Sequence, residues 1–508
     1  MKAKISIFVM LLITIALSAI PNWFTSDVSK EYPDYFVGKS FARIRSGDIL
    51  EAENIAKLEA LKDASSTISC NVSGETINHS SEAGTGSQIK AEEYFLSETK
   101  IRTDLEIMGY EILKTEKEAE NVYFLIGIPA NDLLNSFKNK IENSIRKISE
   151  VYDFAEELAE NNPEQSIKKY EECIFQTGLL QDDLQIYLFL NKWQNEFQND
   201  ISKLPSQQKI ENKLIILVGS TTKSTETLAN DLLKTFLLQQ SGNYSFIFYP
   251  FEYENTGFIS NFGKNFAEIC SGILTDKKKW QSISYSKNKE ADLVFRGKIM
   301  ESDNGMLLTL TMENSNKMVV KSNQLFVNKT TCVNIGWDKI KPENLEQALQ
   351  SKLALYNSIQ TDNCLKVDIQ TDKMSDGPVI YYYDEEPKIL VRTNKSCFVR
   401  LMYIFADGTK ILLVDNYPIA TDQANQWIQI PFDGVICEPS GVEQLILQAS
   451  TEKQPVVNYK RKNMGDGTYI DIIEVDISSQ IALTRGIKIK NPKKEITEKV
   501  YQWTVFEK

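Results

Sequence analysis

Residues 214–233, LIILVGSTTKSTETLANDLL, contain the side chains that could most readily hold a phosphate group. An apolar run ends at Gly219, and Lys223 follows just before a segment with a helical pattern. A phosphate-binding loop needs G-x-x-x-x-G-K-[ST], because its glycines let backbone amides point at the phosphates while the lysine reaches the outer oxygens. Thr222 occupies the place of the second glycine, and Gly219 precedes Lys223 by four positions where the motif needs six. We therefore expect no nucleotide site.

The alternative for this stretch is a turn between a strand and a helix. Ser224 or Thr225 can cap the helix, because a hydroxyl at the N-cap accepts a backbone N–H that would otherwise lack a partner. Glu226 would lie in the first turn, where a negative charge is favourable. The sequence predicts no cofactor-binding residue and no cofactor.

Catalytic arrangements that depend on histidine are restricted by composition. His79 is the only histidine among 508 residues, and it lies in the polar stretch NHSSEAGTGS, where we expect a solvated loop. An H-E-x-x-H zinc site needs two histidines, and a Ser-His-Asp arrangement would have to use His79 without an accompanying G-x-S-x-G. The sequence predicts no catalytic and no metal-binding residue.

Carboxylates are abundant, so a glycosidase-like pair of acids is the chemistry that composition leaves open. Asp182 and Asp183 are adjacent, and adjacent side chains point apart on a helix or a strand. The stretch YYYDEEP at 381–387 could hold a ligand through its tyrosines, but an edge strand ended by Pro387 is favoured. GDGT at 465–468 lacks the D-x-D-x-D-G spacing of a calcium loop.

Length and composition indicate a folded protein with several domains. The chain is 42% hydrophobic and 25% charged, which is the usual balance for a folded soluble protein. Its 57 basic and 69 acidic residues give a formal charge of -12, and an acidic chain lacks the electrostatic footprint of a nucleic-acid partner. The seven cysteines include no C-x-x-C, so we expect buried free thiols rather than a zinc site or a disulfide framework.

The N-terminus is typical of a secretory signal peptide. Lys2 and Lys4 precede an uncharged, mostly apolar run at 5–20, and small residues at 16–19 suit cleavage. This run is shorter than a spanning helix requires, although an uncleaved anchor is the alternative. The first cysteine is Cys70, so no lipid anchor is expected. We expect an exported chain in the periplasm or cell envelope, with peripheral membrane association left open.

The first half of the chain has strong helical periodicity. Alanines spaced four apart at 52–64 predict a helix with a small-residue face, followed by a loop at 71–87. Strands are expected at 107–113 and 121–128, separated by the charged turn KTEKEAE. Apolar residues spaced three or four apart predict a long helix from Asn131 and further helices to Pro205, which we interpret as a spacer.

In the second half of the chain the sequence pattern changes at residue 366, from alternating strands and helices to strands alone. Residues 213–329 read as an α/β unit, with strands KLIILVG, SFIFYPF and ADLVFRGKIM, intervening helices and a final hairpin. From 366 onwards short alternating strands predict a β-sandwich, with a hairpin turn at Asp407-Gly408.

Three segments resemble known families. PNWF and YFVGKSFARI, the alanine-rich helix and GYEILKTEKEAENVYFLIGIP resemble envelope lipoproteins of the LPP-twenty type and the N-terminal domain of the flagellar envelope protein FlgT. The middle unit is similar to the α/β domain shared by FlgT, TolB and CsgG, which implies that the loop after its first strand is not a nucleotide site. Residues 381–450 resemble a β-sandwich domain of unknown function (DUF 4384 type), to which the resemblance attaches no activity.

The expected fold is a multidomain α+β protein with a C-terminal β-sandwich. Its expected parts are a signal peptide at 1–19, an LPP-twenty/FlgT-like domain at 20–149, a helical spacer at 150–210, a TolB/CsgG-like α/β domain at 211–331, a helical linker at 332–365 and the sandwich with C-terminal strands at 366–508.

Three functions fit this organisation. The first is a non-enzymatic envelope scaffold for assembly or interaction, whose partners would be other envelope proteins. The second is a binding module for a peptide or glycan, which exposed aromatics at 381–383 or at Trp427 would favour. The third is a carboxylate hydrolase, which would need two inward-facing acids about 5–10 Å apart in a cleft.

Overall fold

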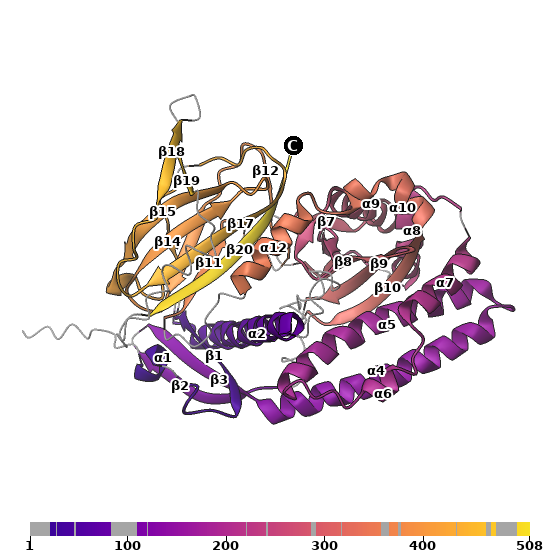
Figure 1. The fold of residues 1–508 in the computed structure, drawn as a ribbon, viewed down its shortest axis with the longest axis horizontal. Helices are drawn as coiled ribbons and strands as arrows, with labels where there is room; N and C mark the ends of the chain where they lie inside the picture. The colour runs from indigo at the N-terminus through magenta and orange to yellow at the C-terminus, as the bar shows by residue number, and fades with distance from the viewer. Residues whose placement is uncertain are drawn as a thin grey trace, which may run out of the picture.

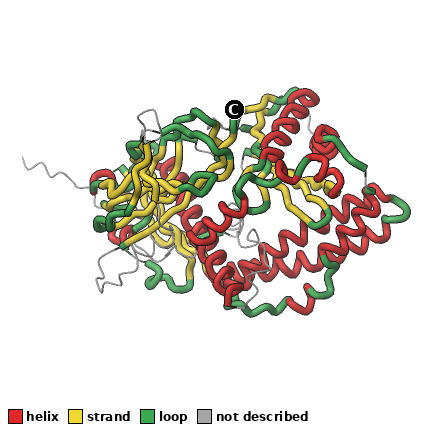
Figure 2. Tube along the Cα trace, turned by 45° about the horizontal axis from the view of Figure 1, so that its top comes forward, coloured by secondary structure: helices red, strands yellow, loops and turns green. Residues whose placement is uncertain are grey.

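The computed structural model describes residues 21–82 except 27 and 45–46, 109–356 except 119, 220, 240–241, 286–290 and 316, 365–473 except 374–376, 433 and 464–468, and 495–508. The expected signal peptide and the GDGT stretch lie outside these residues. The chain is a multidomain α+β protein with a β-rich C-terminal region, as the sequence predicted (Figures 1 and 2).

The N-terminal part is a three-stranded antiparallel sheet covered by the long helix α2. The strand order is β1-β3-β2. The predicted alanine face is buried against this sheet, and it permits a close approach, because a Cβ on Gly38 would lie 2.0 Å from the backbone oxygen of Ala60. The elements are α1 (Asn22–Thr25), β1 (Tyr35–Arg43), α2 (Ile49–Glu82), β2 (Glu111–Glu118) and β3 (Asn121–Pro129).

Two boundaries in this part differ from the expectation. The loop expected at 71–87 is helical up to Glu82, because Ile68 and Val72 continue the buried face of α2 at a spacing of four. His79 therefore lies in a helix, and its side chain is outside the described part. The charged stretch expected as a turn is mostly strand β2, an edge strand whose charged side chains alternate between more and less exposed positions.

The helical part is a hairpin of two long helices followed by shorter ones. The predicted stripe of α4 is confirmed, with Phe137, Ile141 and Ile148 among its buried residues. Asn162 caps α5 by accepting the N–H of Gln165 at 3.2 Å. The boundary expected at 149/150 falls inside α4. The helices are α4 (Ala130–Leu158), α5 (Pro163–Leu190), α6 (Gln198–Ile201) and α7 (Gln207–Val218).

The strand expected for KLIILVG at 213–219 was wrong, because these residues end helix α7. Ser206 caps this helix by accepting the N–H of Lys209 at 3.2 Å. Ile210 and Leu214 are buried one turn apart, and Gly219 ends the helix with a φ of 70°. A favourable cap and one buried stripe outweigh the strand preference of the β-branched residues.

The middle part is a mixed sheet with helices on both faces. Its main strand order is β10-β9-β8-β4-β7. Leu308 of β9 faces the core formed with α8 and α9, while the adjacent Leu307 packs in the core that includes α5 and α7. The elements are α8 (Thr225–Gln239), β4 (Ser245–Phe248), β5 (Glu252–Tyr253), β6 (Phe258–Ile259), α9 (Asn261–Lys278), β7 (Gln281–Ile283), β8 (Leu293–Ser302), β9 (Gly305–Asn314), β10 (Val319–Asn328), α10 (Lys329–Ile335), α11 (Trp337–Ile340) and α12 (Leu345–Tyr356).

The C-terminal part contains a three-stranded sheet in the order β11-β13-β16 and a seven-stranded sheet in the order β12-β20-β17-β14-β15-β19-β18. Apolar residues of both sheets share one core, as a sandwich requires. The predicted hairpin turn at Asp407-Gly408 is confirmed, with Gly408 at a φ of 81°. The strands are β11 (Val367–Thr371), β12 (Ile380–Tyr382), β13 (Ile389–Thr393), β14 (Cys397–Ile404), β15 (Lys410–Ile419), β16 (Ile428–Gln429), β17 (Gly441–Ser450), β18 (Tyr459–Asn463), β19 (Tyr469–Ile473) and β20 (Ile496–Phe506).

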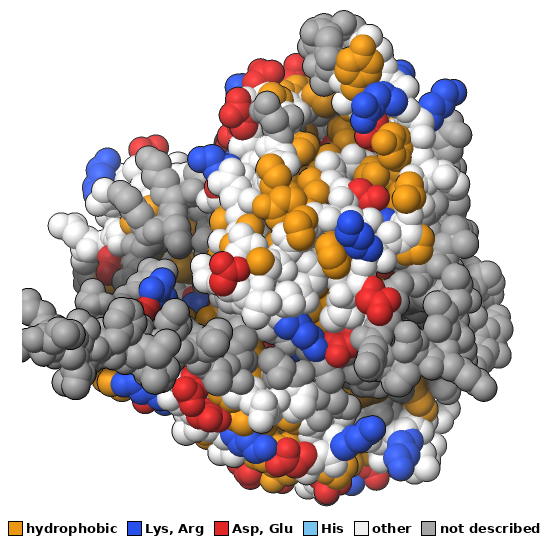
Figure 3. Space-filling view, turned by 90° about the vertical axis from the view of Figure 1, so that its left-hand side faces the viewer, with side chains coloured by type: hydrophobic (Ala, Val, Ile, Leu, Met, Phe, Trp, Pro, Cys, Tyr) orange, Lys and Arg blue, Asp and Glu red, His pale blue; other side chains and the backbone are white. Residues whose placement is uncertain are grey.

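The surface of the sandwich is mixed in character. The β18–β19 hairpin projects from the larger sheet (Figure 1), and every residue of β18 is exposed. On the side of the molecule drawn in Figure 3, apolar side chains gather over the sandwich, with basic and acidic side chains scattered among them. Among the helices of the described residues, none has an apolar stretch long enough to cross a membrane.

Candidate functional site

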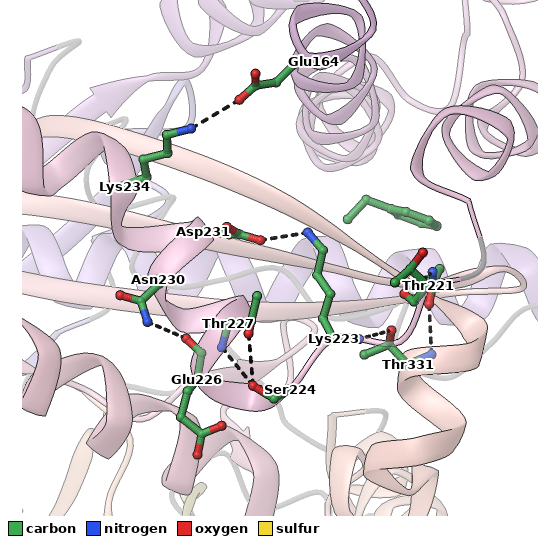
Figure 4. Close-up of polar contacts among 12 residues, drawn as sticks. Glu164, Thr221, Lys223, Ser224, Glu226, Thr227, Asn230, Asp231, Lys234 and Thr331 are labelled. Atoms are coloured by element: carbon green, nitrogen blue, oxygen red, sulfur yellow. Dashed lines mark hydrogen bonds and ion pairs between the residues drawn. The ribbon is translucent and has the colours of Figure 1, made fainter.

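The loop between α7 and α8 is the stretch that came closest to a phosphate-binding motif, and contacts from the end of β10 and the start of α10 hold it in place (Figure 4). The Asn328 side chain donates to the backbone oxygens of Gly219 and Thr221, at 2.9 and 3.3 Å. The backbone N–H of Lys223 donates to Thr331 Oγ1 at 3.3 Å. This amide therefore already has an acceptor inside the protein.

The side chain of Lys223, which would have to bind a phosphate, already forms an ion pair within the protein. Lys223 Nζ lies 2.7 Å from Asp231 Oδ2, one of the acids of α8 (Figure 4). Ser224 accepts the N–H of Thr227 at 3.2 Å, which makes it the cap that the sequence predicted as one of two alternatives. Glu226 lies in the first turn, as expected. The geometry is that of a capped helix start with an internal ion pair.

The tyrosines of 381–383 were the second candidate, as a ligand-binding platform. Tyr381 is 1% exposed, and its hydroxyl donates to Asp372 at 3.0 Å. Burial raises the pKa of Tyr381 strongly. Tyr383 Oη lies 2.6 Å from Ser440 Oγ, and Lys264 lies over the ring of Tyr382 at 4.9 Å. These aromatics pack within the protein.

Trp427, the other aromatic considered for ligand binding, is also packed. Its ring lies 4.8 Å from the guanidinium of Arg392, and the side chain is half-buried. Arg392 in turn bonds to Asp368 at 2.7 Å and to Glu59 of α2 at 3.4 Å. Trp427 thus belongs to a cluster that joins the sandwich to α2.

The adjacent acids Asp182 and Asp183, which the sequence made a poor hydrolytic pair, occupy different environments on α5. Asp183 is buried, while Asp182 is half-buried and accepts the side-chain N–H of Asn255 at 3.3 Å. This contact links α5 to the β5–β6 region.

One polar hollow of about 430 Å³ lies beside the end of α5. Lys138 and Glu196 form an ion pair across it at 2.7 Å, and the hydroxyl of Tyr187 donates to Glu196 at 2.6 Å. Its polar groups thus bond mainly to each other. It is lined by Leu134, Asn135, Lys138, Tyr187, Asn191, Gln194, Asn195 and Glu196.

A buried carboxyl that sequence reasoning missed is Glu443 in the sandwich, which is 1% exposed. Its Oε2 accepts the hydroxyl of Tyr403 and the indole N–H of Trp503, the latter at 3.2 Å. Burial raises the pKa of Glu443 to about 7, although these two hydrogen bonds oppose the shift. In the sequence GVEQLILQAS, the only signal was an acid at an inward position of an apolar strand.

The described thiols are free. Cys173, Cys270, Cys332 and Cys397 are buried, as the sequence predicted, whereas Cys437 is exposed. Burial raises the pKa of Cys173 to about 12, so this thiol stays protonated at neutral pH. Among the residues that the structure describes, no group of three or more His, Cys, Asp or Glu side chains could hold a metal ion.

Comparisons with known proteins add little to this geometry. No family model matches the chain, and no curated protein matches it. Among solved structures, the chain is similar to the secreted protein HP1454 from the human pathogen Helicobacter pylori, at 11% identity over 64% of this chain and 96% of that chain. The TM-score is 0.22, which carries no structural argument. The resemblances to the LPP-twenty, FlgT, TolB, CsgG and DUF 4384 families stay predictions.

Proposed function

We propose that this chain is an exported, non-enzymatic protein of the cell envelope that acts as a scaffold for assembly or interaction. Export rests on the basic start and the apolar run of the first 20 residues. The periplasmic location and the LPP-twenty, FlgT-like, TolB-like and DUF 4384-like character of the parts belong to the same proposal.

The observation that carries the scaffold proposal is the set of polar contacts between parts that lie far apart in the chain. Glu171 of α5 bonds to Phe326 of β10, Arg392 of β13 bonds to Glu59 of α2, and the Asn344 side chain bonds to Val442 of β17. Contacts of this kind fix the relative positions of the parts, as a protein that positions others requires.

The contacts at the former site candidates agree with this proposal. The ammonium of Lys223 is paired with Asp231, Tyr381 is buried, and the half-buried Trp427 packs on Arg392. These side chains contribute to the packing of the molecule. Binding energy for partners would then come from its outer surfaces.

The proposal is tested by cross-linking in intact source cells, followed by fractionation and mass spectrometry of the adducts. A scaffold forms discrete adducts with envelope proteins, through the same surface residues in repeated experiments. Recovery of the chain from the cytoplasm, without such adducts, would refute both the location and the role.

A further inference from the structure

Glu443 is a carboxyl group enclosed in the core of the sandwich. It lies on β17 on the same face as the buried Leu445 and Leu447. Its Oε2 accepts two hydrogen bonds, from Tyr403 of β14 and Trp503 of β20. Its Oε1 is buried and has no hydrogen-bond partner among the described residues. A protonated carboxyl tolerates this enclosure much better than a carboxylate does.

The residues on either side of Glu443 hold the segment that leads into α12. The N–H of Val442 donates to Asn344 Oδ1 at 2.9 Å, and Asn344 Nδ2 donates to the oxygens of Val442 and Ala406 at 2.9 and 2.8 Å. The side chain of Gln444 donates to the backbone oxygen of Ala348 at 3.0 Å. Because side chains alternate along a strand, β17 points Glu443 inward while its neighbours bind α12 on the other face.

The groups that face Glu443 are neutral or acidic. Tyr403 and Trp503 come from the two neighbouring strands, and Tyr381 of β12 packs on Trp503 with ring centroids 5.2 Å apart. Asp407, in the turn after β14, raises the pKa of Glu443 further by repulsion.

The residues that precede β17 also lie near this carboxyl. Partial desolvation raises the pKa of the Cys437 thiol most, although the residue is exposed, and repulsion from Glu443 and Glu438 raises it further. In the part of the chain that the structure describes, Glu443 forms no ion pair with a lysine or an arginine. Tyr403, Trp503 and the backbone N–H of Ala406 favour the ionised form of Glu443, but burial outweighs all three.

We propose that the protonation state of Glu443 controls how firmly α12 is held against the sandwich. The neutral carboxyl fits the core and keeps the start of β17 in place. The ionised carboxyl, with one oxygen unpartnered, favours opening of this end of β17 towards water. Opening separates Val442 and Gln444 from Asn344 and Ala348, so α12 and the start of β17 lose protection together.

The direction of the pH dependence follows from proton linkage. The folded-state pKa of Glu443 is raised from 4.5 to about 7, so the folded form binds this proton more tightly than the open form. Its stabilising effect is fully present below about pH 4.5 and is lost as the pH rises to about 7. The opening constant should rise on the order of tenfold per pH unit inside this window and level off above it.

Hydrogen exchange of the full-length protein between pH 5 and pH 8, corrected for the intrinsic pH dependence of amide exchange, tests this inference. In the wild type, the opening constant of the amides in α12 and at the start of β17 should rise with pH up to about 7 and then level off. Glu443→Gln, which stays neutral, should remove the dependence. Glu498→Gln is the matched control, because Glu498 is a buried acid on the opposite face of the sheet, bonded to Gln448 at 2.8 Å. It should behave like the wild type.

Tyr403→Phe is a second variant, which keeps the carboxyl but removes one donor to it. Loss of this donor destabilises the ionised form, so the plateau should move to higher pH. A flat wild-type profile, or an unchanged dependence in Glu443→Gln, would overturn the inference. If Glu443→Gln does not fold, an unshifted plateau in Tyr403→Phe would overturn it.

Discussion

The carboxylate of Glu171 on α5 accepts the backbone N–H of Phe326 on β10 at 2.7 Å, although 155 positions separate the two residues. Glu171 is 1% exposed, and its other oxygen bonds to Lys168 at 2.9 Å. The contact ties the helical hairpin to the edge strand of the middle sheet. The carboxylate thus accepts an N–H of the edge strand for which no neighbouring strand supplies a hydrogen-bond partner.

Glu171→Ala should destabilise the whole protein by about 3 kcal/mol, because it leaves the buried N–H of Phe326 without an acceptor. Urea unfolding followed by circular dichroism measures this change. Glu172→Ala is the matched control, because the neighbouring Glu172 is only half-buried and bonds to Lys169 and Lys147 at 2.8 and 3.3 Å. An equal loss in both variants would mean that the buried contact has no special weight.

The helical hairpin also shows how far the sequence could predict the fold. The α4 stripe was readable, because Phe137, Ile141 and Ile148 repeat at helical spacing over many turns. The contact between Glu171 and Phe326 was not readable, because neither residue carries a local signal of its distant partner.

In the loop between α7 and α8 the sequence predicted the helix cap but not the contacts that hold the loop. The glycine spacing before Lys223 argued against a phosphate cradle, and Ser224 was one of two expected caps. The β-branched run at 214–218 was misread as a strand, although Ser206 and the spacing of Ile210 and Leu214 were signals for a helix. Asn328, which holds the loop, is 109 positions from Gly219 and could not be placed from the sequence.

Lys223→Ala should leave the affinity for magnesium ATP unchanged at a level too weak to detect by titration calorimetry. The lysine is paired with Asp231, and its backbone N–H is bonded to Thr331, so no phosphate cradle is lost. Asp231→Asn is the matched variant, because it frees the lysine without removing it. Micromolar binding by the wild type that disappears in Lys223→Ala would contradict the interpretation of this loop.

Arg392→Ala should destabilise the protein by about 2 kcal/mol. The change removes the cation bonded to Glu59 and the packing on Trp427, and it leaves Asp368 with the more distant Lys499, at 3.9 Å. The expected loss of stability is moderate because the side chain of Asp368 is 40% exposed, so solvent screens its attraction to Arg392. Arg461→Ala is the control, because Arg461 pairs with Asp471 on the projecting β18–β19 hairpin. No difference between the two variants would show that the cluster at Arg392 does not stabilise the joint.

Two fragments test the boundary expected at 365/366. Residues 366–508 are expected to fold as a sandwich, since both sheets and, apart from Leu365, their shared core lie within them. A fragment from 341 adds Asn344 and α12, whose contacts with Val442 and Gln444 should raise the unfolding temperature. Thermal unfolding of each fragment by calorimetry checks this, and a less stable longer fragment would mean that α12 belongs only to the middle part.

The central claim, an exported scaffold, is tested most directly by recovering the native chain from its own cells after cross-linking. We predict a mature chain that begins near residue 20, in the envelope fraction, cross-linked to a small and reproducible set of envelope proteins. The partners should be lost when surface residues at the cross-linked positions are changed, while the fold is kept. A chain that still begins at Met1 and is recovered from the cytoplasm without cross-linked partners would contradict the claim.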